Sequence, residues 1–176
     1  QAAAGTADSK ALAEAAAATA APTPCNYTIT KLIPGWTAYK TTQKVAVGGT
    51  FNSVKLSEMK PGGTLTAAFA GLSAEIEGAS IESGNPARNA TVAAAFFGKF
   101  AEQAKITAQI TEASGDEKLG LFMMNVTMNS VTKSLQLRHE GLKDGTLVAK
   151  TVINMLDFGL QGAFDSIHKT CEALHT

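Results

Sequence analysis

From residue 25 onward, β-branched and aromatic residues alternate with polar ones, and Gly, Asn and Pro interrupt the alternation at short intervals. A period of two is typical of strands with one buried face, and the interruptions are typical of turns. The pattern predicts strands at residues 26–33, 36–41, 45–56, 65–70, 74–82, 105–111, 118–129, 133–140 and 146–156. No strand-helix-strand rhythm connects them, so we expect a mostly antiparallel sandwich or barrel.

Two short helices interrupt this all-β pattern. The first, at residues 87–100, follows Asn85-Pro86, a common helix start. Its apolar side chains fall near helical spacing, at Val92, Phe96, Phe97 and Phe100. The second helix, at residues 166–174, has Asp165 or Ser166 as its expected N-cap. We expect each helix to lie across an opening or an edge of the sheet.

The strand at residues 118–129 predicts which side chains face inward, because alternate residues of a strand share a face. The expected inward side chains on the last strands are apolar and mostly unbranched: Phe122, Met124, Val126, Met128, Leu135, Leu137, Ile153 and Met155. Methionine is flexible and polarizable, so such a wall adapts to a long flexible ligand. Without further information, the filled core of a small barrel explains these residues better.

Composition narrows the possible partners. The 176 residues carry 15 Lys+Arg and 15 Asp+Glu, so no net field attracts nucleic acid or an anionic membrane. No run of about 18 apolar residues predicts a transmembrane segment. Residues 1–24 are rich in Ala, Thr and Pro and are read as a linker to a domain at residues 25–176, and the missing initial Met suggests a removed signal peptide or upstream module.

The two cysteines, Cys25 and Cys171, lie near the two ends of the predicted domain. A disulfide between them would close a long loop, which the chain-entropy account values at roughly 4 to 5 kcal/mol. Such a bond implies an oxidising compartment. The alternative is a pair of unrelated buried thiols. No Cys-x-x-Cys pair is present, so we expect no metal site.

Catalytic machinery is not visible in the sequence. The three histidines, at positions 139, 168 and 175, are scattered, and no Ser/His/Asp or Glu-x-x-His spacing accompanies them. His139 is expected to face solvent. A lipid-acting enzyme would have to use Glu82, Asp157 or His168, and no constellation makes them reactive, so we expect a binding protein with no catalytic cofactor.

One segment goes beyond general β patterning: ASIESGNPARN at residues 79–89, followed by Phe96-Phe97. It resembles the YceI family, in which a strand leads through Gly-Asn and Arg-Asp into a helix with an aromatic or apolar pair. Three further segments resemble the family in the same order: VGGTF at 47–51, VTMNSVTK at 126–133, and Ile153-Asn154 with DFG at 157–159.

The resemblance implies a lipocalin-like, up-and-down antiparallel barrel from the bacterial periplasm or a secreted protein. It also implies a bound isoprenoid lipid, such as a polyprenyl phosphate or a ubiquinone-like quinone. The side chains expected around the tail are the eight above together with Phe96, Phe97, Phe100, Phe158 and Trp36. Those expected at the headgroup are Arg88, Asn85 and Asn89, although Arg88 and Asn85 also fit a role in bracing the turn.

Three departures from the family pattern bear on this interpretation. Asn89 stands where the family has Asp, Met155-Leu156 replaces a basic residue, and a short helix with Cys171 replaces the last strand. We expect the module to serve a fused or partner electron-transfer domain, with a homodimer also allowed. The alternative function is a carbohydrate-binding module of a secreted polysaccharide-degrading protein, for which one Trp and two Tyr are few.

Overall fold

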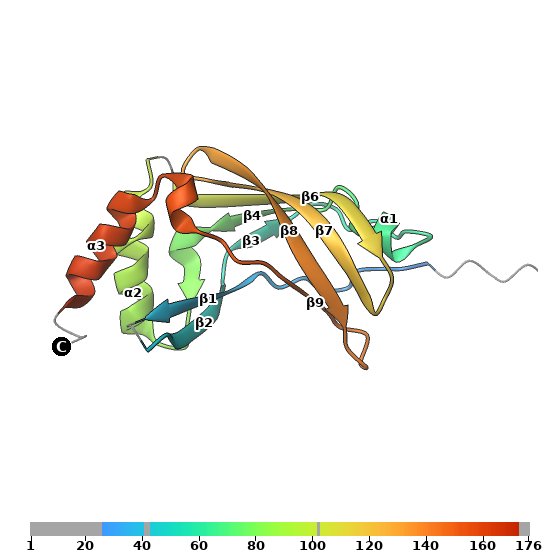
Figure 1. Ribbon diagram of the computed structural model, residues 1–176, viewed down its shortest axis with the longest axis horizontal. Helices are drawn as coiled ribbons and strands as arrows, with labels where there is room; N and C mark the ends of the chain where they lie inside the picture. The colour runs from blue at the N-terminus through green and yellow to red at the C-terminus, as the bar shows by residue number, and fades with distance from the viewer. Residues whose placement is uncertain (1–25, 41–42, 102, 173–176) are drawn as a thin grey trace, which may run out of the picture.

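Two antiparallel sheets form the molecule, whose computed structural model describes residues 26–40, 43–101 and 103–172 (Figure 1). The larger sheet has six strands in the order β3 (Val54–Leu56), β4 (Ser73–Glu77), β6 (Lys105–Gly115), β7 (Leu119–Met128), β8 (Val131–Gly141) and β9 (Leu147–Lys150). The smaller sheet contains β1 (Gly35–Lys40), β2 (Val45–Phe51) and β5 (Ile81–Glu82). The larger sheet curls into a half-barrel, which confirms the predicted mostly antiparallel β class.

Three α-helices close the two ends of the half-barrel. Helices α2 (Pro86–Ala95) and α3 (Gln161–Cys171) lie side by side at one end, and α1 (Leu65–Phe69) lies at the other (Figure 1). The predicted start of α2 is confirmed, because the Asn85 side chain caps the helix by accepting a hydrogen bond from the Arg88 N–H at 3.0 Å. A 3₁₀ turn at Phe97–Lys99 then completes the segment that was predicted as one helix.

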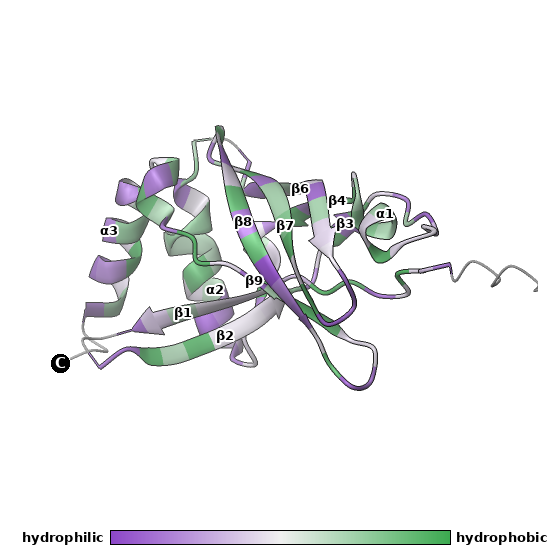
Figure 2. Cartoon of the chain, turned by 45° about the vertical axis from the view of Figure 1, so that its right-hand side comes forward, coloured by the Kyte–Doolittle hydropathy of each residue, from purple (hydrophilic) through white to green (hydrophobic). Residues whose placement is uncertain are grey.

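The inward face predicted for β7 is confirmed. Phe122, Val126 and Met128 are each 2% exposed, whereas the residues between them are half-buried. The main core cluster joins this face to the end of α2 and the start of α3, and its members are Ile81, Phe96, Phe97, Phe100, Val126, Met128, Phe158, Leu160 and Ala163. The hydropathy colouring in Figure 2 shows apolar positions on the helices where they face the strands.

Two segments predicted as single strands pass from one sheet to the other. Residues 45–56 divide into β2 and β3 at Asn52 and Ser53, whose N–H groups donate to the carbonyl and hydroxyl oxygens of Ser80. Residues 74–82 divide in the same way into β4, a 3₁₀ turn at Gly78–Ser80, and β5. The two breaks face each other, so one hydrogen-bonded corner moves both chain segments between the sheets.

The strand predicted at residues 65–70 is wrong, because this segment forms α1. The Thr64 hydroxyl accepts a hydrogen bond from the Ala67 N–H at 3.1 Å and begins the helix. Leu65 and Ala68 are buried at helical spacing. A short apolar run fits either a strand or a helix, and here the N-cap decides.

The strands predicted at residues 26–33 and 146–156 are also largely wrong. In the first segment only Tyr27 pairs, through an isolated bridge to Gly62. The second keeps strand structure only in β9, after which Asn154 caps a 3₁₀ turn at Met155–Phe158 that ends at Gly159, with φ of 67°. Both segments cross the open side of the half-barrel (Figures 1 and 2).

The last helix begins earlier than predicted. Helix α3 starts at Gln161, so Asp165 and Ser166 lie inside it and cap nothing, and Asp165 instead accepts a hydrogen bond from the Gln161 side chain. Burial explains the early start, because Leu160 and Ala163 belong to the core cluster and hold the first turn against it.

We predict that Gly78→Ala destabilises the fold. A Cβ at this position would lie 2.3 Å from the Phe97 ring and 2.9 Å from the Ala104 carbonyl oxygen. Phe97 is buried, so the clash should cost about 1–3 kcal/mol in the free energy of unfolding, measured with urea. The control is Gly162→Ala in α3, where nothing lies within 4 Å of the added methyl and a gain of about 0.5–1 kcal/mol is expected. Equal effects of the two changes would contradict the prediction.

Candidate functional site

The concave face of the half-barrel consists of side-chain rows that run across neighbouring strands. The pairing register places Ile106, Met128 and Val131 in one row, and Ile110, Met124 and Leu135 in another. Further along come Ala113 with Phe122 and Leu137, and then Gly115 with Gly120, His139 and Ala149. A further row between the first two joins Ala108, Val126 and Lys133, so the residues of this face are apolar or glycine apart from Lys133 and His139.

The row nearest α2 and α3 is sealed by aromatic side chains. The rings of Phe96, Phe97 and Phe100 lie within 5.1–5.6 Å of one another. Together with Phe158 they bury Met128, so this end of the concave face is a packed core.

The row near α1 is closed by a separate aromatic stack. Phe69 of α1 stacks on Phe122 with ring centroids 4.8 Å apart, and Phe122 stacks on His139 at 4.5 Å. Phe122 and His139 are both buried. The Tyr27 hydroxyl donates to the Glu117 carboxylate, which ties the segment before β1 to the β6–β7 turn beside α1 and lowers the pKa of Glu117.

Between these two ends, the concave face is only partly covered. Ile110, Met124, Leu135 and Leu137 are half-buried, although all four are apolar and come from adjacent strands. We call these four residues the trough. In the chain segments that cross the open side, the Ile33 and Val152 side chains are 57% and 92% exposed, so these two side chains do not cover the trough.

The predicted tail residues fall into three positions. Six belong to the core cluster: Phe96, Phe97, Phe100, Val126, Met128 and Phe158. Five are partly buried against it: Trp36, Met124, Leu135, Ile153 and Met155. Phe122 and Leu137 lie at the α1 end. Ile153 and Met155 follow β9 instead of lying on a strand, which corrects their expected position.

The predicted headgroup residues lie at the start of α2. The Asn89 carbonyl oxygen accepts hydrogen bonds from the Ser83 N–H at 3.0 Å and the Ser83 hydroxyl at 2.7 Å, and its amide donates to Glu82 at 3.0 Å. These hydrogen bonds, together with the one that the Asn85 side chain accepts from the Arg88 N–H, hold the turn before α2 in place. The half-buried Arg88 guanidinium lies 3.5 Å from the Ser83 hydroxyl oxygen. The hydrogen bonds from Asn89 and from the Gly84 N–H lower the pKa of Glu82. A headgroup role for the three residues stays a prediction.

His139 does not face solvent, which corrects the expectation from sequence. It is 0% exposed. Its position follows from the period of two, because Leu135 and Leu137 already define the inward face of β8 and His139 is the next residue on that face.

A polar depression of about 510 Å³ lies on the opposite, convex face of the sheet. Its lining residues are Gln103, Lys105, Thr107, Thr127, Asn129 and Ser130. Lys105 is paired there with Glu75 at 3.0 Å. None of the predicted tail residues lines this depression, so its chemistry is separate from that of the trough.

Neither a metal site nor a membrane-spanning helix is found in the part of the chain that the structure describes. Within residues 26–40, 43–101 and 103–172, no three His, Cys, Asp or Glu side chains gather as metal ligands would. No helix in the same ranges is both long and apolar enough to span a bilayer. Cys171 is half-buried at the end of α3, and its proposed partner Cys25 lies outside the described residues, so the disulfide stays a prediction.

Fold and site together define a curled, mostly antiparallel half-barrel with an apolar concave face. The sequence matches the YceI-like domain over residues 28–172, and the chain belongs to the YceI family. No curated protein matches the sequence.

Several solved structures share the fold. A YceI protein of Campylobacter jejuni is 22% identical with a TM-score of 0.55, over 74% of this chain and 80% of that one. A polyisoprenoid binding domain from Saccharophagus degradans, implicated in plant cell wall breakdown, is 15% identical with a TM-score of 0.54, over 80% of this chain and 82% of that one.

We predict that Asn89→Asp destabilises the protein most at neutral pH. In the wild type, Glu82 has a lowered pKa, so its stabilisation is present above its unfolded-state pKa and disappears as pH falls through the folded value. In the variant, two adjacent carboxylates raise each other's pKa. The deficit in unfolding free energy should therefore shrink toward about pH 4, where carboxyl groups protonate. Chemical unfolding at several pH values measures it.

Asn85→Asp is the matched control for this experiment. It adds the same charge to the same helical turn but keeps an N-cap that can accept from the Arg88 N–H. A deficit for Asn89→Asp that does not change with pH would contradict the argument.

Proposed function

We propose that this protein binds the chain of an isoprenoid lipid along the trough and does not catalyse a reaction. The observation that supports it most directly is the contrast in burial along one concave face, with two closed ends and a half-buried apolar middle. A protein core is normally covered throughout, and an apolar surface that remains partly open is typical of a ligand-binding groove.

The trough suits a flexible chain better than a rigid polar molecule. Ile110, Met124, Leu135 and Leu137 offer no hydrogen-bonding groups, and Met124 can adopt several shapes. Affinity would come from burial of apolar surface, at roughly 25 cal/mol per Å² before the costs of association are subtracted. Membership of the YceI family and the shared fold with a polyisoprenoid binding domain support an isoprenoid as the source of that chain.

The proposal also covers which isoprenoid is bound and where the protein binds it. The isoprenoid is proposed to be a polyprenyl phosphate or a ubiquinone-like quinone, bound in the periplasm or outside the cell. A fused or partner electron-transfer domain would exchange the quinone.

Carbohydrate binding has less support. Stacking on a sugar needs an exposed aromatic ring. Trp36 is half-buried, is packed against the core cluster, and donates its indole N–H to the Thr50 carbonyl at 3.2 Å. The Trp36 ring is therefore committed to the fold, and the exposed rings of Tyr39 and Phe164 lie on separate elements, β1 and α3.

Native mass spectrometry of the purified protein tests the proposal. We predict that the wild type carries a copurified isoprenoid, identifiable after extraction. Leu135→Lys should lower the lipid-bound fraction by roughly tenfold or more, because burying one such side chain is worth about 1.5–3 kcal/mol and 1.4 kcal/mol is a factor of ten.

Ser134→Lys provides the control on the same strand. Ser134 is exposed and adjacent to Leu135, so its side chain points to the convex face and lipid loading should not change. A lipid-free wild type, or equal loading of the two variants, would overturn the proposal.

A further inference from the structure

The concave face of the larger sheet carries a single charged side chain among the described residues, that of Lys133. The pairing register places Lys133 beside Val126 of β7, and Leu135 follows it on the inward face of β8. At the other inward positions of this sheet the register places apolar residues, glycine or His139. One cation therefore stands on a surface that otherwise suits a hydrocarbon chain.

The ammonium group of Lys133 is accessible and is not used by the fold. Within the described residues, ion pairs join Lys60 to Glu58 and Lys105 to Glu75. Lys133 takes part in no ion pair or side-chain hydrogen bond with the same residues, and its side chain is exposed. Its charge is thus free to meet a ligand.

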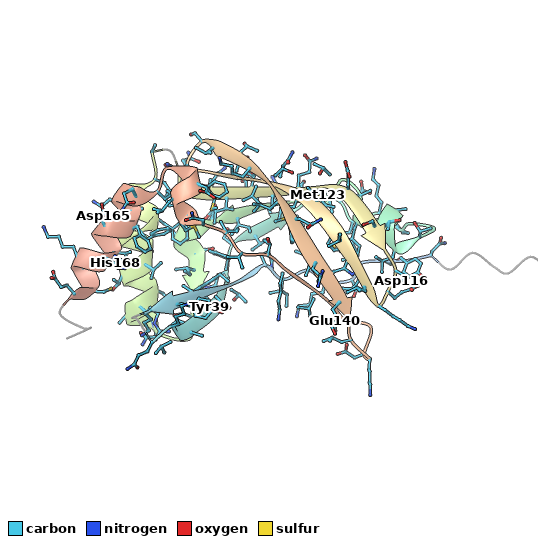
Figure 3. The ribbon with its side chains drawn as sticks, in the orientation of Figure 1. Tyr39, Asp116, Met123, Glu140, Asp165 and His168 are labelled. Carbon is cyan, nitrogen blue, oxygen red and sulfur yellow. The ribbon has the colours of Figure 1, made fainter. Side chains whose placement is uncertain are left out.

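Lys133 lies where the apolar face meets an open sheet edge. Strand β9 pairs with residues 138–141 of β8 and not with the residues before them, so β9 does not cover the edge at Lys133. Figure 3 labels Glu140, which lies in the part of β8 that β9 covers. Two residues of a strand span about 7 Å, so Lys133 is adjacent to Leu135 of the trough. Its aliphatic stem can follow the apolar face while the ammonium group reaches water.

A charged headgroup fits this edge better than either end of the concave face. Removing an unpaired charge from water is costly. At the α2 end aromatic rings bury Met128, and at the α1 end Phe122 and His139 are enclosed. At Lys133 a phosphate would stay in contact with water and would accept a charge-assisted hydrogen bond from the ammonium group.

We propose that the Lys133 ammonium group binds the phosphate headgroup of a lipid whose chain lies in the trough, so that the protein selects an isoprenoid phosphate over a neutral isoprenoid such as a quinone. This inference rests on the proposed function and decides between the two ligands named there. It places the headgroup at the open edge of β8, with the chain leading over Leu135 and Leu137, and not at the start of α2.

A matched pair of ligands tests the proposal. Farnesyl phosphate and farnesol share one chain and differ in the charged group. Their binding to the full chain can be measured by equilibrium dialysis below the micelle concentration, with the ligand quantified by mass spectrometry. At low ionic strength the wild type should bind the phosphate roughly three- to tenfold more tightly, an effect of the size expected for a partly hydrated ion pair. Added salt should reduce the preference, because salt screens exposed charges.

Variants of two cations on the same strand assign the preference. Lys133→Gln should remove both the preference for the phosphate and its salt dependence, while its retained binding of farnesol shows that the trough is intact. Lys133→Arg should keep the preference, because it keeps the charge. Arg138→Gln is the matched control, since Arg138 is exposed on the convex face of β8 and its loss should leave the preference as in the wild type.

The outcomes separate this inference from the proposed function. If the wild type binds neither ligand, the proposed function itself is refuted. Equal binding of the phosphate and the alcohol, or equal effects of Lys133→Gln and Arg138→Gln, would refute the role of Lys133 and leave chain binding standing. A preference that persists in Lys133→Gln and is lost in Arg88→Gln would locate the headgroup at the start of α2 and overturn the inference.

Discussion

A sheet with one apolar face has to bury that face. In this protein the apolar face of the larger sheet is buried at its two ends and only half-buried in the middle, and the rest of the structure depends on this difference. The rows of β6, β7 and β8 form a largely apolar surface, interrupted at Lys133 and His139, that neither the small sheet nor the helices cover along its whole length. Aromatic side chains from α2 and the turn after it cover one end, and Phe69 of α1 covers the other. The middle is left half-buried, and that uncovered stretch is the basis of the proposed function.

The hydrogen-bonded corner at Ser80 determines where the chain passes between the small sheet and the larger sheet. Hydrogen bonds from Asn52 and Ser53 move the chain out of the small sheet and into the half-barrel, and the 3₁₀ turn at Gly78–Ser80 returns it. The same turn positions β5 before the start of α2, so that Phe96 and Phe97 reach the core. A local exchange of sheets thus determines where the sealed end of the concave face lies.

Local patterns could predict the elements whose partners are neighbours in sequence. The β7 face, the β7–β8 hairpin and the start of α2 follow from alternation and from Asn85-Pro86, because each depends on contacts within a few residues. Residues 26–33 and 151–156 alternate or are apolar like strands, yet they form no ladder, since pairing depends on a distant edge that the sequence does not specify. The half-open site depends on this missing ladder, so it could not be predicted.

His139 illustrates a different kind of failure. The sequence contained the required information, because a residue two positions after Leu137 on the same strand must share its face. The usual exposure of histidine predicts a side chain in solvent, whereas the period of two on β8 predicts an inward side chain, and the structure follows the period. What no pattern could supply is the pairing of Nε2 with Ser114, which comes from β6 across the intervening β7.

The two ends of the concave face are closed by side chains of different chemistry. At the α2 end, Met128 meets only apolar groups, so a polar headgroup there could be held only outside the core, near Arg88. At the α1 end, an acceptor lies inside the aromatic stack itself. Because that acceptor is completely enclosed, the open part of the concave face is its half-buried middle, between two ends that are closed in different ways.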